Sequence, residues 1–342
     1  MGMLKDTKIE QETHMNYVKA FAIIAMVCGH AASPLNPYIY QYHMALFVFV
    51  AGYFYKDYYT EHPITLIWKR IKSLYIPFLI YNVIFIFLSS VCDALNITDR
   101  GRHILGNINL VEMLKSLVSF NSYADYLGGF WFVKTLFFTT VAYCLLSFVI
   151  NKLKLTKEGY RAGIILVIYV IAWIMIKKEL DINKNIIQVP MTLIIFYFGY
   201  LYNRYKDNIN LNLYGFLISI WVLYANAKSG IIDIDSLSFT GPVFYIVSSL
   251  AGAYVNIYIA EFLSKKFRKI KYLDFIGKST YAILAIHLLT QDILKKMLRV
   301  TYINLGKYEW IVDVIIAINI SVVIYYCYLK LRNYIYNKIK ER

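Results

Sequence analysis

Three histidines lie in or at the edge of long apolar runs, where few other side chains can do chemistry. His30 ends one run, His43 begins the next, and His287 lies inside a late one. A buried imidazole stays neutral and has a pKa near 6.5 in water, so it suits general acid-base catalysis at neutral pH. We therefore treat the three as candidate catalytic residues. Hydrogen-bonded packing is the alternative for each, above all for His43.

A short basic run is the second candidate site. Lys69, Arg70 and Lys72 stand directly before an apolar segment. Such charges orient a membrane segment and attract anionic lipid, and they can equally bind a polyphosphate. Their spacing does not decide between these interpretations. A further lysine, Lys134, stands with Trp131 at the start of another apolar run, where it can reach the membrane interface by snorkelling.

No metal site is expected, because no group of His, Cys or carboxylate residues has ligand spacing within one helix. The four cysteines lie in or at the ends of apolar runs, without the spacing of a disulfide framework or a metal centre. We expect them to be packing residues. They are Cys28, Cys92, Cys144 and Cys327.

The composition places these residues in a membrane protein. Of 342 residues, 59% are hydrophobic and only 17% are charged, whereas soluble domains carry about 25% charged residues. A soluble protein would expose large apolar patches, while a lipid environment accepts them. The formal charge of +15 comes from short Lys and Arg clusters between apolar runs, a pattern typical of membrane topology and not of nucleic-acid binding.

About ten windows are long and apolar enough to cross a bilayer as helices, since crossing takes about 20 residues. We predict an all-α polytopic membrane protein with about ten transmembrane helices in one bundle. The windows are 16–33, 41–58, 74–91, 130–150, 162–176, 186–201, 213–227, 243–263, 275–294 and 310–329.

The distribution of Lys and Arg predicts the orientation. With ten spans, 24 of these residues fall on the side of the termini and 11 on the other side, including Arg100 and Arg102. The positive-inside rule then gives a cytoplasmic N-terminus and C-terminus. We expect a cytoplasmic segment at 1–15, a transmembrane domain at 16–331 and a basic cytoplasmic tail at 332–342. The longest outer connection, 92–129, contains a stretch at 110–120 with helical apolar spacing, expected to be an interfacial helix.

Five segments in order carry a family resemblance. They are NYVKAFAIIAMVCGH (16–30), YHMALFVFVAGYF (42–54), WKRIKSLYIPF (68–78), GGFWFVKTLFF (128–138) and GKSTYAILAIH (277–287). Together they resemble acyltransferase family 3, the integral-membrane O-acyltransferases, and in particular its fucose 4-O-acetylase-like branch. The chain departs from the family pattern at Ala45 and Ala51, which replace Pro and Ser, and at Asn16, where many members have Asp.

The resemblance implies roles for particular residues. His30 would be the catalytic histidine, as general base or transient acyl carrier, with His287 and His43 shaping the site. Lys69, Arg70 and Lys72 would hold the phosphates of the donor, although related enzymes often have more arginine there and lysine is a poorer bidentate phosphate ligand. The residues implied to contact substrate are Trp131, Lys134 and Tyr281.

The resemblance also implies an activity and a location. Such enzymes look like carriers of an acyl group, most often acetyl from acetyl-CoA, across the membrane to a hydroxyl of a cell-envelope or exported carbohydrate. The expected location is the bacterial cytoplasmic membrane, and the expected partners are the acyl-CoA, the carbohydrate, the lipid bilayer and glycan-assembly proteins. No nucleic-acid partner is expected.

Two other classes of function stay open. Some chains that resemble this family have been assigned to export of a polysaccharide or lipid-linked sugar, and a purely structural membrane protein is the third possibility. An exporter needs a continuous polar path, whereas the sequence has few charges inside its spans. A structural role leaves His30 and His287 unexplained. The sequence thus favours the enzyme.

Overall fold

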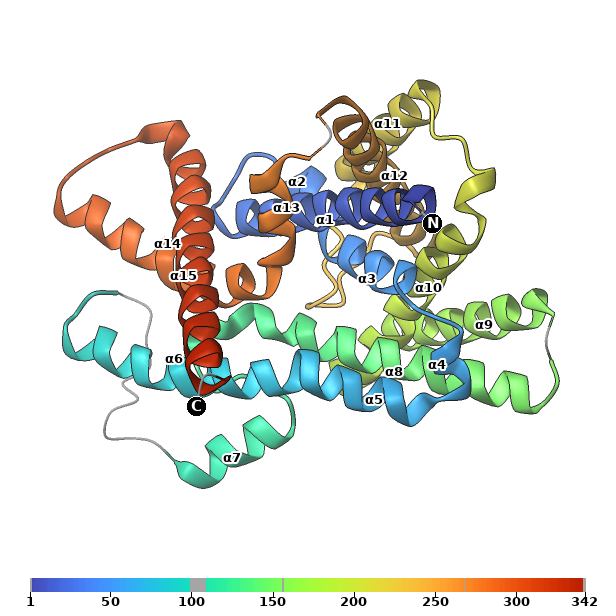
Figure 1. Ribbon diagram of the computed structural model, residues 1–342, viewed down its shortest axis with the longest axis horizontal. Helices are drawn as coiled ribbons and strands as arrows, with labels where there is room; N and C mark the ends of the chain where they lie inside the picture. The colour runs from blue at the N-terminus through green and yellow to red at the C-terminus, as the bar shows by residue number, and fades with distance from the viewer. Residues whose placement is uncertain (1, 99–108, 156, 268, 341–342) are drawn as a thin grey trace.

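The computed structural model describes residues 2–98, 109–155, 157–267 and 269–340, and these form an all-helical protein (Figure 1). Within them, extended pairing is limited to one isolated bridge between Asp233 and Ser238. The helices are α1 (Gly2–His30), α2 (Asn36–Ile39), α3 (His43–Tyr53), α4 (Tyr58–Glu61), α5 (Pro63–Arg70), α6 (Ile76–Ala94), α7 (Leu110–Val118), α8 (Trp131–Lys152), α9 (Glu158–Lys177), α10 (Lys184–Tyr205), α11 (Leu213–Ser229), α12 (Pro242–Phe267), α13 (Lys271–Lys278), α14 (Thr280–Val300) and α15 (Glu309–Lys340).

Six helical segments of the described chain are long and apolar enough to cross a membrane. The four other expected spans fall on α1, α3, α11 and α14, which are shorter or more polar. α3 has 11 residues, about 17 Å of helix, too short to cross about 30 Å of hydrocarbon. The count of ten spans is therefore not confirmed, and the orientation stays a prediction. The six segments are Pro63–Ala94, Asp125–Lys152, Glu158–Lys177, Lys184–Asn208, Pro242–Phe267 and Gly306–Lys340.

Two expectations at the periphery have clear outcomes. The predicted helix in the long connection is present as α7, where the Asn109 side chain caps the backbone N–H groups of Val111 and Glu112 at 3.1 and 3.2 Å. Arg100 and Arg102, in the same connection, lie outside the described residues. The expected basic tail is helical as far as Lys340, as the end of α15, and 341–342 also lie outside the described residues; the location of this tail in the cytoplasm stays a prediction.

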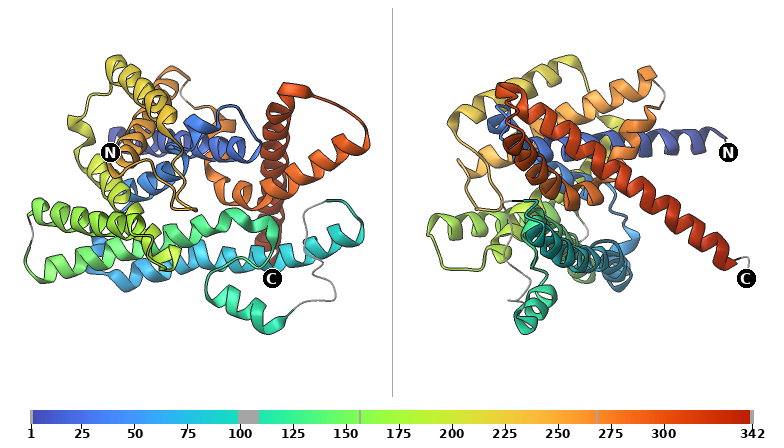
Figure 2. Two further views of the ribbon diagram at one scale, coloured as in Figure 1. Left: turned by 180° about the vertical axis from the view of Figure 1, so that it is seen from behind. Right: turned by 90° about the vertical axis from the view of Figure 1, so that its left-hand side faces the viewer.

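α1 lies at the centre of the bundle, packed against α3, α12, α13, α14 and α15. In Figure 1 it runs along the longest dimension of the molecule, as do α5, α6 and α8, and Figure 2 shows the strong tilt of α15 across these helices. The start of α1 lies toward the end of the molecule that holds α5, while its last residue, His30, lies toward the other end. The buried apolar side chains of these helices form one continuous core.

A close helix crossing joins α3 to α10 through two glycines. A Cβ atom added to Gly52 would lie 1.9 Å from the carbonyl oxygen of Phe196, and one added to Gly199 would lie 1.9 Å from that of Phe49. No other residue type fits, because each backbone occupies the space of the missing side chain. This crossing anchors the short α3, which is only 11 residues long, and thereby the chain position of His43 at its start.

A π-helical turn, Ile71–Tyr75, joins α5 to α6; it begins directly after Arg70 and contains Lys72. Pro77 follows it, in the first turn of α6. A proline ring clashes with the carbonyl four residues earlier and offers no N–H, so a wider turn at this point accommodates it without ending the helix. The result is the continuous helical segment Pro63–Ala94, with Lys69, Arg70 and Lys72 near its start.

Candidate functional site

His30 is the last residue of α1 and is exposed at a cavity. Two residues that follow in the chain hold this helix end. The side-chain amide of Asn36 donates to the carbonyl oxygen of Gly29 at 3.0 Å, one of the carbonyls that a helix terminus leaves unsatisfied. The ring of Tyr40 lies so close to Gly29 that an added Cβ would be 3.3 Å from its Cε2 atom. These contacts fix the end of α1 and, with it, the position from which the His30 side chain extends.

His287 lies beside His30 and is completely buried on α14. The centroids of the two rings are 5.2 Å apart, with the planes tilted by 46°. Nδ1 of His287 is 3.0 Å from the carbonyl oxygens of both Ile283 and Leu284. Because a carbonyl only accepts, Nδ1 carries the proton, and the neutral ring keeps its lone pair on Nε2. His287 is thus an oriented imidazole behind the accessible one.

The segment before α8, which contains Gly128 and Gly129, also packs beside the two histidines. A Cβ atom added to Gly129 would lie 2.9 Å from Cδ1 of Leu284 and 4.0 Å from Cε1 of His287. The 3-10 segment Asp125–Phe130 therefore packs directly against α14 beside the histidine. This contact places Trp131, the first residue of α8, in the wall of the same cavity.

His43 is buried at the start of α3 and lines the cavity as well. Its Nδ1 lies 2.9 Å from the carbonyl oxygen of Ile39, so its neutral tautomer also carries the proton on Nδ1. The Tyr40 ring meets it edge-on, with centroids 5.0 Å apart. Packing and catalysis both have support at His43. The backbone holds one ring nitrogen, as expected of a packing residue, while the ring faces the cavity, as expected of a catalytic one.

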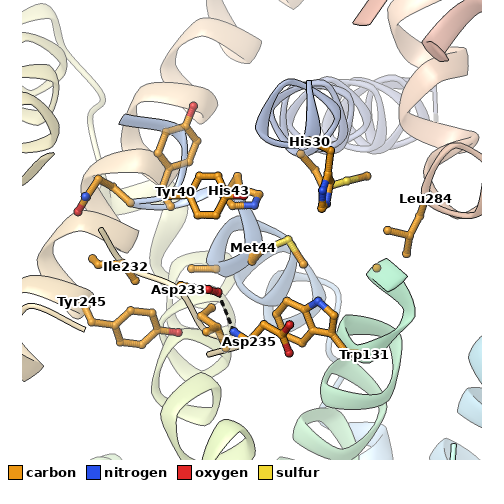
Figure 3. Close-up of a pocket in the computed structure, with 16 residues that line it drawn as sticks. His30, Tyr40, His43, Met44, Trp131, Ile232, Asp233, Asp235, Tyr245 and Leu284 are labelled. Atoms are coloured by element: carbon orange, nitrogen blue, oxygen red, sulfur yellow. Dashed lines mark hydrogen bonds between the residues drawn. The ribbon is translucent and has the colours of Figure 1, made fainter. Parts of the chain in front are cut away.

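The cavity has a volume of about 130 Å³ and collects residues from distant parts of the chain (Figure 3). Three predicted site residues line it: His30, His43 and Trp131. One accessible imidazole, next to a second and oriented one, suits removal of a proton from a hydroxyl group that enters. The remaining wall includes Tyr40, Gly129, Asp233, Asp235, Tyr245 and Leu284.

Lys134 does not line this cavity, although it is only one turn beyond Trp131. It is buried, and its Nζ donates to Oδ1 of Asn121 at 2.8 Å. Neither a substrate contact nor snorkelling to an interface describes this geometry. In this structure, Lys134 ties α8 to the connection that precedes it.

The basic run divides between the surface and the interior. Lys69 and Lys72 lie on one open surface with Thr65, Trp68 and Ser73, which we call the basic surface. The Lys69 ammonium group donates to the Tyr59 hydroxyl at 2.7 Å.

Arg70 turns away from the basic surface. Its side chain is half-buried, and its Nε atom is buried without a hydrogen-bond partner in the described chain. The run of three charges in the sequence is therefore not one patch of three charges in space.

Tyr281 also lies outside the His30 cavity. It lines a largely apolar groove of about 470 Å³ between α6, α14 and α15, which we call the Tyr281 groove. Its hydroxyl donates to the carbonyl oxygen of Leu74 at 2.9 Å. Ser73 belongs to both this groove and the basic surface, while Lys278 and Arg332 add positive charges to its wall. The groove thus continues from the basic surface along α14.

Two carboxylates of the cavity, Asp233 and Asp235, were not expected. They stand in the connection 230–241 between α11 and α12, whose Gly, Asp, Ser and Thr residues are typical of a turn. The only signal was the alternation of Ile232 and Ile234 with the two aspartates. In the structure both isoleucines are buried, so the alternation marks a segment with one side in the protein.

Comparison with known proteins agrees with the geometry. Residues 13–329 match the acyltransferase domain of acyltransferase family 3. The chain therefore belongs to this family of membrane acyltransferases, and the match covers nearly its whole length. No curated protein and no solved structure has a significant match to the chain. The fucose 4-O-acetylase-like branch is not resolved by the match.

Proposed function

We propose that the protein transfers an acetyl group from acetyl-CoA to a hydroxyl of a cell-envelope or exported carbohydrate, as a member of the fucose 4-O-acetylase-like branch. One observation carries the proposal: within the acyltransferase domain, the exposed His30 lies 5.2 Å from the oriented ring of His287, at a cavity that a substrate can enter. Of these two imidazoles, His30 is the accessible one, so we assign it the contact with the reacting groups.

In the proposed reaction, His30 acts as the general base. Its neutral ring accepts the proton of the acceptor hydroxyl while the oxygen attacks the carbonyl carbon of the thioester. The tetrahedral intermediate collapses, the C–S bond breaks, and the CoA thiolate leaves and takes the proton from the imidazolium. The products are the ester and free CoA, with no net change in protons. We assign His287, behind His30, and His43, in the cavity wall, the role of positioning and polarising this site.

The donor is proposed to approach from the basic surface. Lys69 and Lys72 supply charge for the phosphates of CoA, and the Tyr281 groove leads from Ser73 along α14. Tyr281, in the wall of this groove, is six residues before His287 on α14, about 9 Å along the helix. An extended pantetheine arm covers a distance of this order. With the predicted orientation, the donor enters from the cytoplasm and the acceptor from the outer side of the bacterial membrane.

The test measures O-acetylation of envelope glycan in cells that lack the protein and in the same cells with wild type or His30→Ala. Mass spectrometry quantifies the acetyl groups per sugar, and immunoblotting confirms equal amounts of protein in the membrane. We expect acetylation with wild type and its loss with His30→Ala. Full acetylation with His30→Ala at normal expression would exclude the proposed mechanism.

The same cells distinguish transfer from export. If glycan leaves the cytoplasm only when the protein is present, while its acetyl content per sugar stays constant, the protein is an exporter. Reporter fusions test the orientation separately. A fusion after Lys157 is expected to be cytoplasmic and a fusion after Asp233 external, and the opposite result would remove the argument for a cytoplasmic donor.

A further inference from the structure

The connection between α11 and α12 enters the bundle and is not a loose surface turn. Ile232 and Ile234 are buried, with only 3% and 4% of their surface exposed. Asp233 and Ser238 close the segment into a narrow loop through two backbone hydrogen bonds of 2.8 and 2.9 Å. Irregular backbone inside a membrane protein has to find its hydrogen bonds within the protein, and this segment does so.

Two buried glutamines hold this loop in place. Nε2 of Gln41 donates to the carbonyl oxygen of Gly230 at 2.7 Å, and Nε2 of Gln188, on α10, donates to that of Ile234 at 3.1 Å. Their side-chain oxygens accept in turn, Gln41 from Ser248 at 3.2 Å and Gln188 from Thr135 at 3.0 Å. The first half of the loop, which contains Asp233 and Asp235, is thus held between these two glutamines and has a defined place in the cavity wall.

The two aspartates of the loop have different surroundings. The carboxylate of Asp233 accepts from the backbone N–H of Asp235 at 2.9 Å and from the hydroxyl of Ser236 at 2.7 Å, so it stabilises the turn. The carboxylate of Asp235 accepts no hydrogen bond and forms no ion pair within the described chain, and it lines the cavity half-buried. Burial raises the pKa of Asp235, the Asp233 charge raises it further, and the exposed Lys184 opposes both. A ligand that donates to this carboxylate would compensate for its partial desolvation.

The groups around Asp235 narrow the chemistry of such a ligand. The cavity that it lines also contains the indole of Trp131 and the imidazole of His30 (Figure 3). A carboxylate accepts hydrogen bonds from two hydroxyls, and a flat aromatic face packs against the apolar face of a sugar ring. Asp233 and Asp235 both lie in the wall of the cavity, so their carboxylates would repel a ligand that carries a negative charge.

We infer that Asp235 is a specificity-determining residue of the acceptor subsite: it binds hydroxyls of an uncharged sugar that packs on Trp131, and it excludes acidic sugars. The inference rests on the proposed function, because it assigns the substrate class of the same site. The acceptor is accordingly a neutral sugar residue, with the reacting hydroxyl toward His30. Uronic acids, sialic acids and sugar phosphates do not fit.

The test uses membrane vesicles that contain the protein, radiolabelled acetyl-CoA and the glycans already present in the membrane. Mass spectrometry then identifies each acetyl-bearing sugar residue as neutral or acidic. The variants are Asp235→Asn, which keeps the shape but removes the charge, and Asp235→Glu, which keeps the charge. Asp181→Asn is the matched control, because Asp181 is an exposed aspartate in the connection between α9 and α10 and does not line the cavity.

We expect label on neutral sugar residues with wild type. Asp235→Asn should lower the labelling rate about tenfold to a hundredfold, the effect of losing hydrogen bonds to a charged group, and should increase the share of label on acidic residues. Asp235→Glu should keep the preference for neutral sugars, and Asp181→Asn should behave as wild type. Affinity of the purified variants for CoA should not change, whereas misfolding would lower it.

Two results would overturn the inference and leave the proposed function intact. One is wild-type label on acidic sugar residues, and the other is an Asp235→Asn variant with wild-type rate and specificity. If no glycan gains label in a way that depends on the protein, the proposed function fails and the inference fails with it.

Discussion

The chain builds the His30 cavity and the basic surface in different ways. The cavity draws on the end of α1, the start of α3, the start of α8, the loop between α11 and α12, and α14, which are separated by up to about 250 residues of sequence. The basic surface comes from nine consecutive residues, Thr65–Ser73. One site therefore exists only when distant helices pack, while the other is present in any helix that contains this segment.

This difference predicts how each site responds to substitution. In the cavity, side chains from distant helices are held against one another, so removal of one leaves the others misplaced or unpaired. On the basic surface, exposed charges act through a screened field and replace one another. Substitutions in the cavity should therefore have large and specific effects, and those on the basic surface should be small, additive and dependent on salt.

The largest effect is expected from the two paired imidazoles. His30→Ala should lower glycan acetylation by about a hundredfold or more, the usual contribution of a general base. His287→Ala should lower kcat less, by about tenfold, because this ring acts through His30. The exposed His62, at the end of α4, provides the control: His62→Ala should stay within twofold of wild type. Equal losses at His30 and His287 would contradict the assignment of contact to His30 alone.

A loop anchor tests whether the cavity depends on packing. Gln188→Leu removes the hydrogen bonds to Ile234 and Thr135 and should cost about 1–3 kcal/mol of stability. It should also lower acetylation about tenfold, since the loop with Asp235 loses its place. Thermal unfolding in detergent and glycan acetylation are the two measurements.

The control for Gln188 lies one turn earlier on α10. The side chain of Asn185 donates only to Asn183 at the exposed helix start, so Asn185→Ala should change stability by no more than about 0.5 kcal/mol. If Gln188→Leu loses stability but keeps its acetylation activity, the position of the loop does not matter for catalysis.

Arg70 combines features of both sites: it belongs to the basic run in the sequence, but its side chain turns inward, as the side chains of the cavity do. If its guanidinium reaches the donor phosphates, Arg70→Lys should raise the KM for acetyl-CoA about tenfold, since a lysine cannot replace a bidentate fork. Initial rates at varied acetyl-CoA measure this. Arg204→Lys is the matched control, because Arg204 donates to Tyr200 at 2.9 Å and lies in neither the groove nor the cavity. An unchanged KM with lower stability would make Arg70 a packing residue.

The basic surface itself should respond weakly. Lys69→Ala and Lys72→Ala should each raise the KM for acetyl-CoA only about twofold to threefold, because an exposed ion pair contributes about 0.2–1 kcal/mol. The double variant should show the sum of the two free-energy changes, and both effects should shrink in 0.5 M salt, as expected for screened charges. A loss of activity from either single variant that salt does not alter would place that lysine in a fixed site.

An effect on stability, and none on activity, is expected at Asp274, which joins α13 to α1. Its carboxylate accepts from Asn16 and Lys278 at 2.7 Å and lies 3.2 Å from Lys269. Burial alone would raise the pKa of Asp274, but these partners outweigh it and hold the pKa below its ordinary value. A lowered pKa adds stability that is present above the unfolded value of about 3.9 and is lost as pH falls through the folded value.

Asp274→Asn should therefore lower the free energy of unfolding by about 1 kcal/mol at pH 7, and by less at pH 3, which is below the unfolded pKa of about 3.9, so that part of the stabilisation is already lost. Thermal unfolding midpoints at the two pH values measure the difference. Asp181→Asn should show no such dependence, and an equal loss for Asp274→Asn at both values would contradict the assigned role.

Much of the site could be predicted from local patterns. His30, His43 and Trp131 stand at the ends of apolar runs, and they do meet in one cavity with His287 behind them. Tyr281 and Lys134 belong to similar motifs but lie elsewhere. A motif predicts the position of a residue along its helix, but it does not predict which side of the helix faces the cavity.

The amino-acid sequence by itself determined that this chain is all-helical, that it belongs in a membrane, and which few polar residues its apolar runs contain. These properties follow from composition and local periodicity, which act within each helix. The tertiary structure decided the rest: the contact of His30 with His287, the inward turn of Arg70, and the place of Asp235 beside Trp131. The physical reason is that side-chain neighbours across helices depend on how each helix is rotated and where its backbone can approach another, and these are set by packing over the whole bundle.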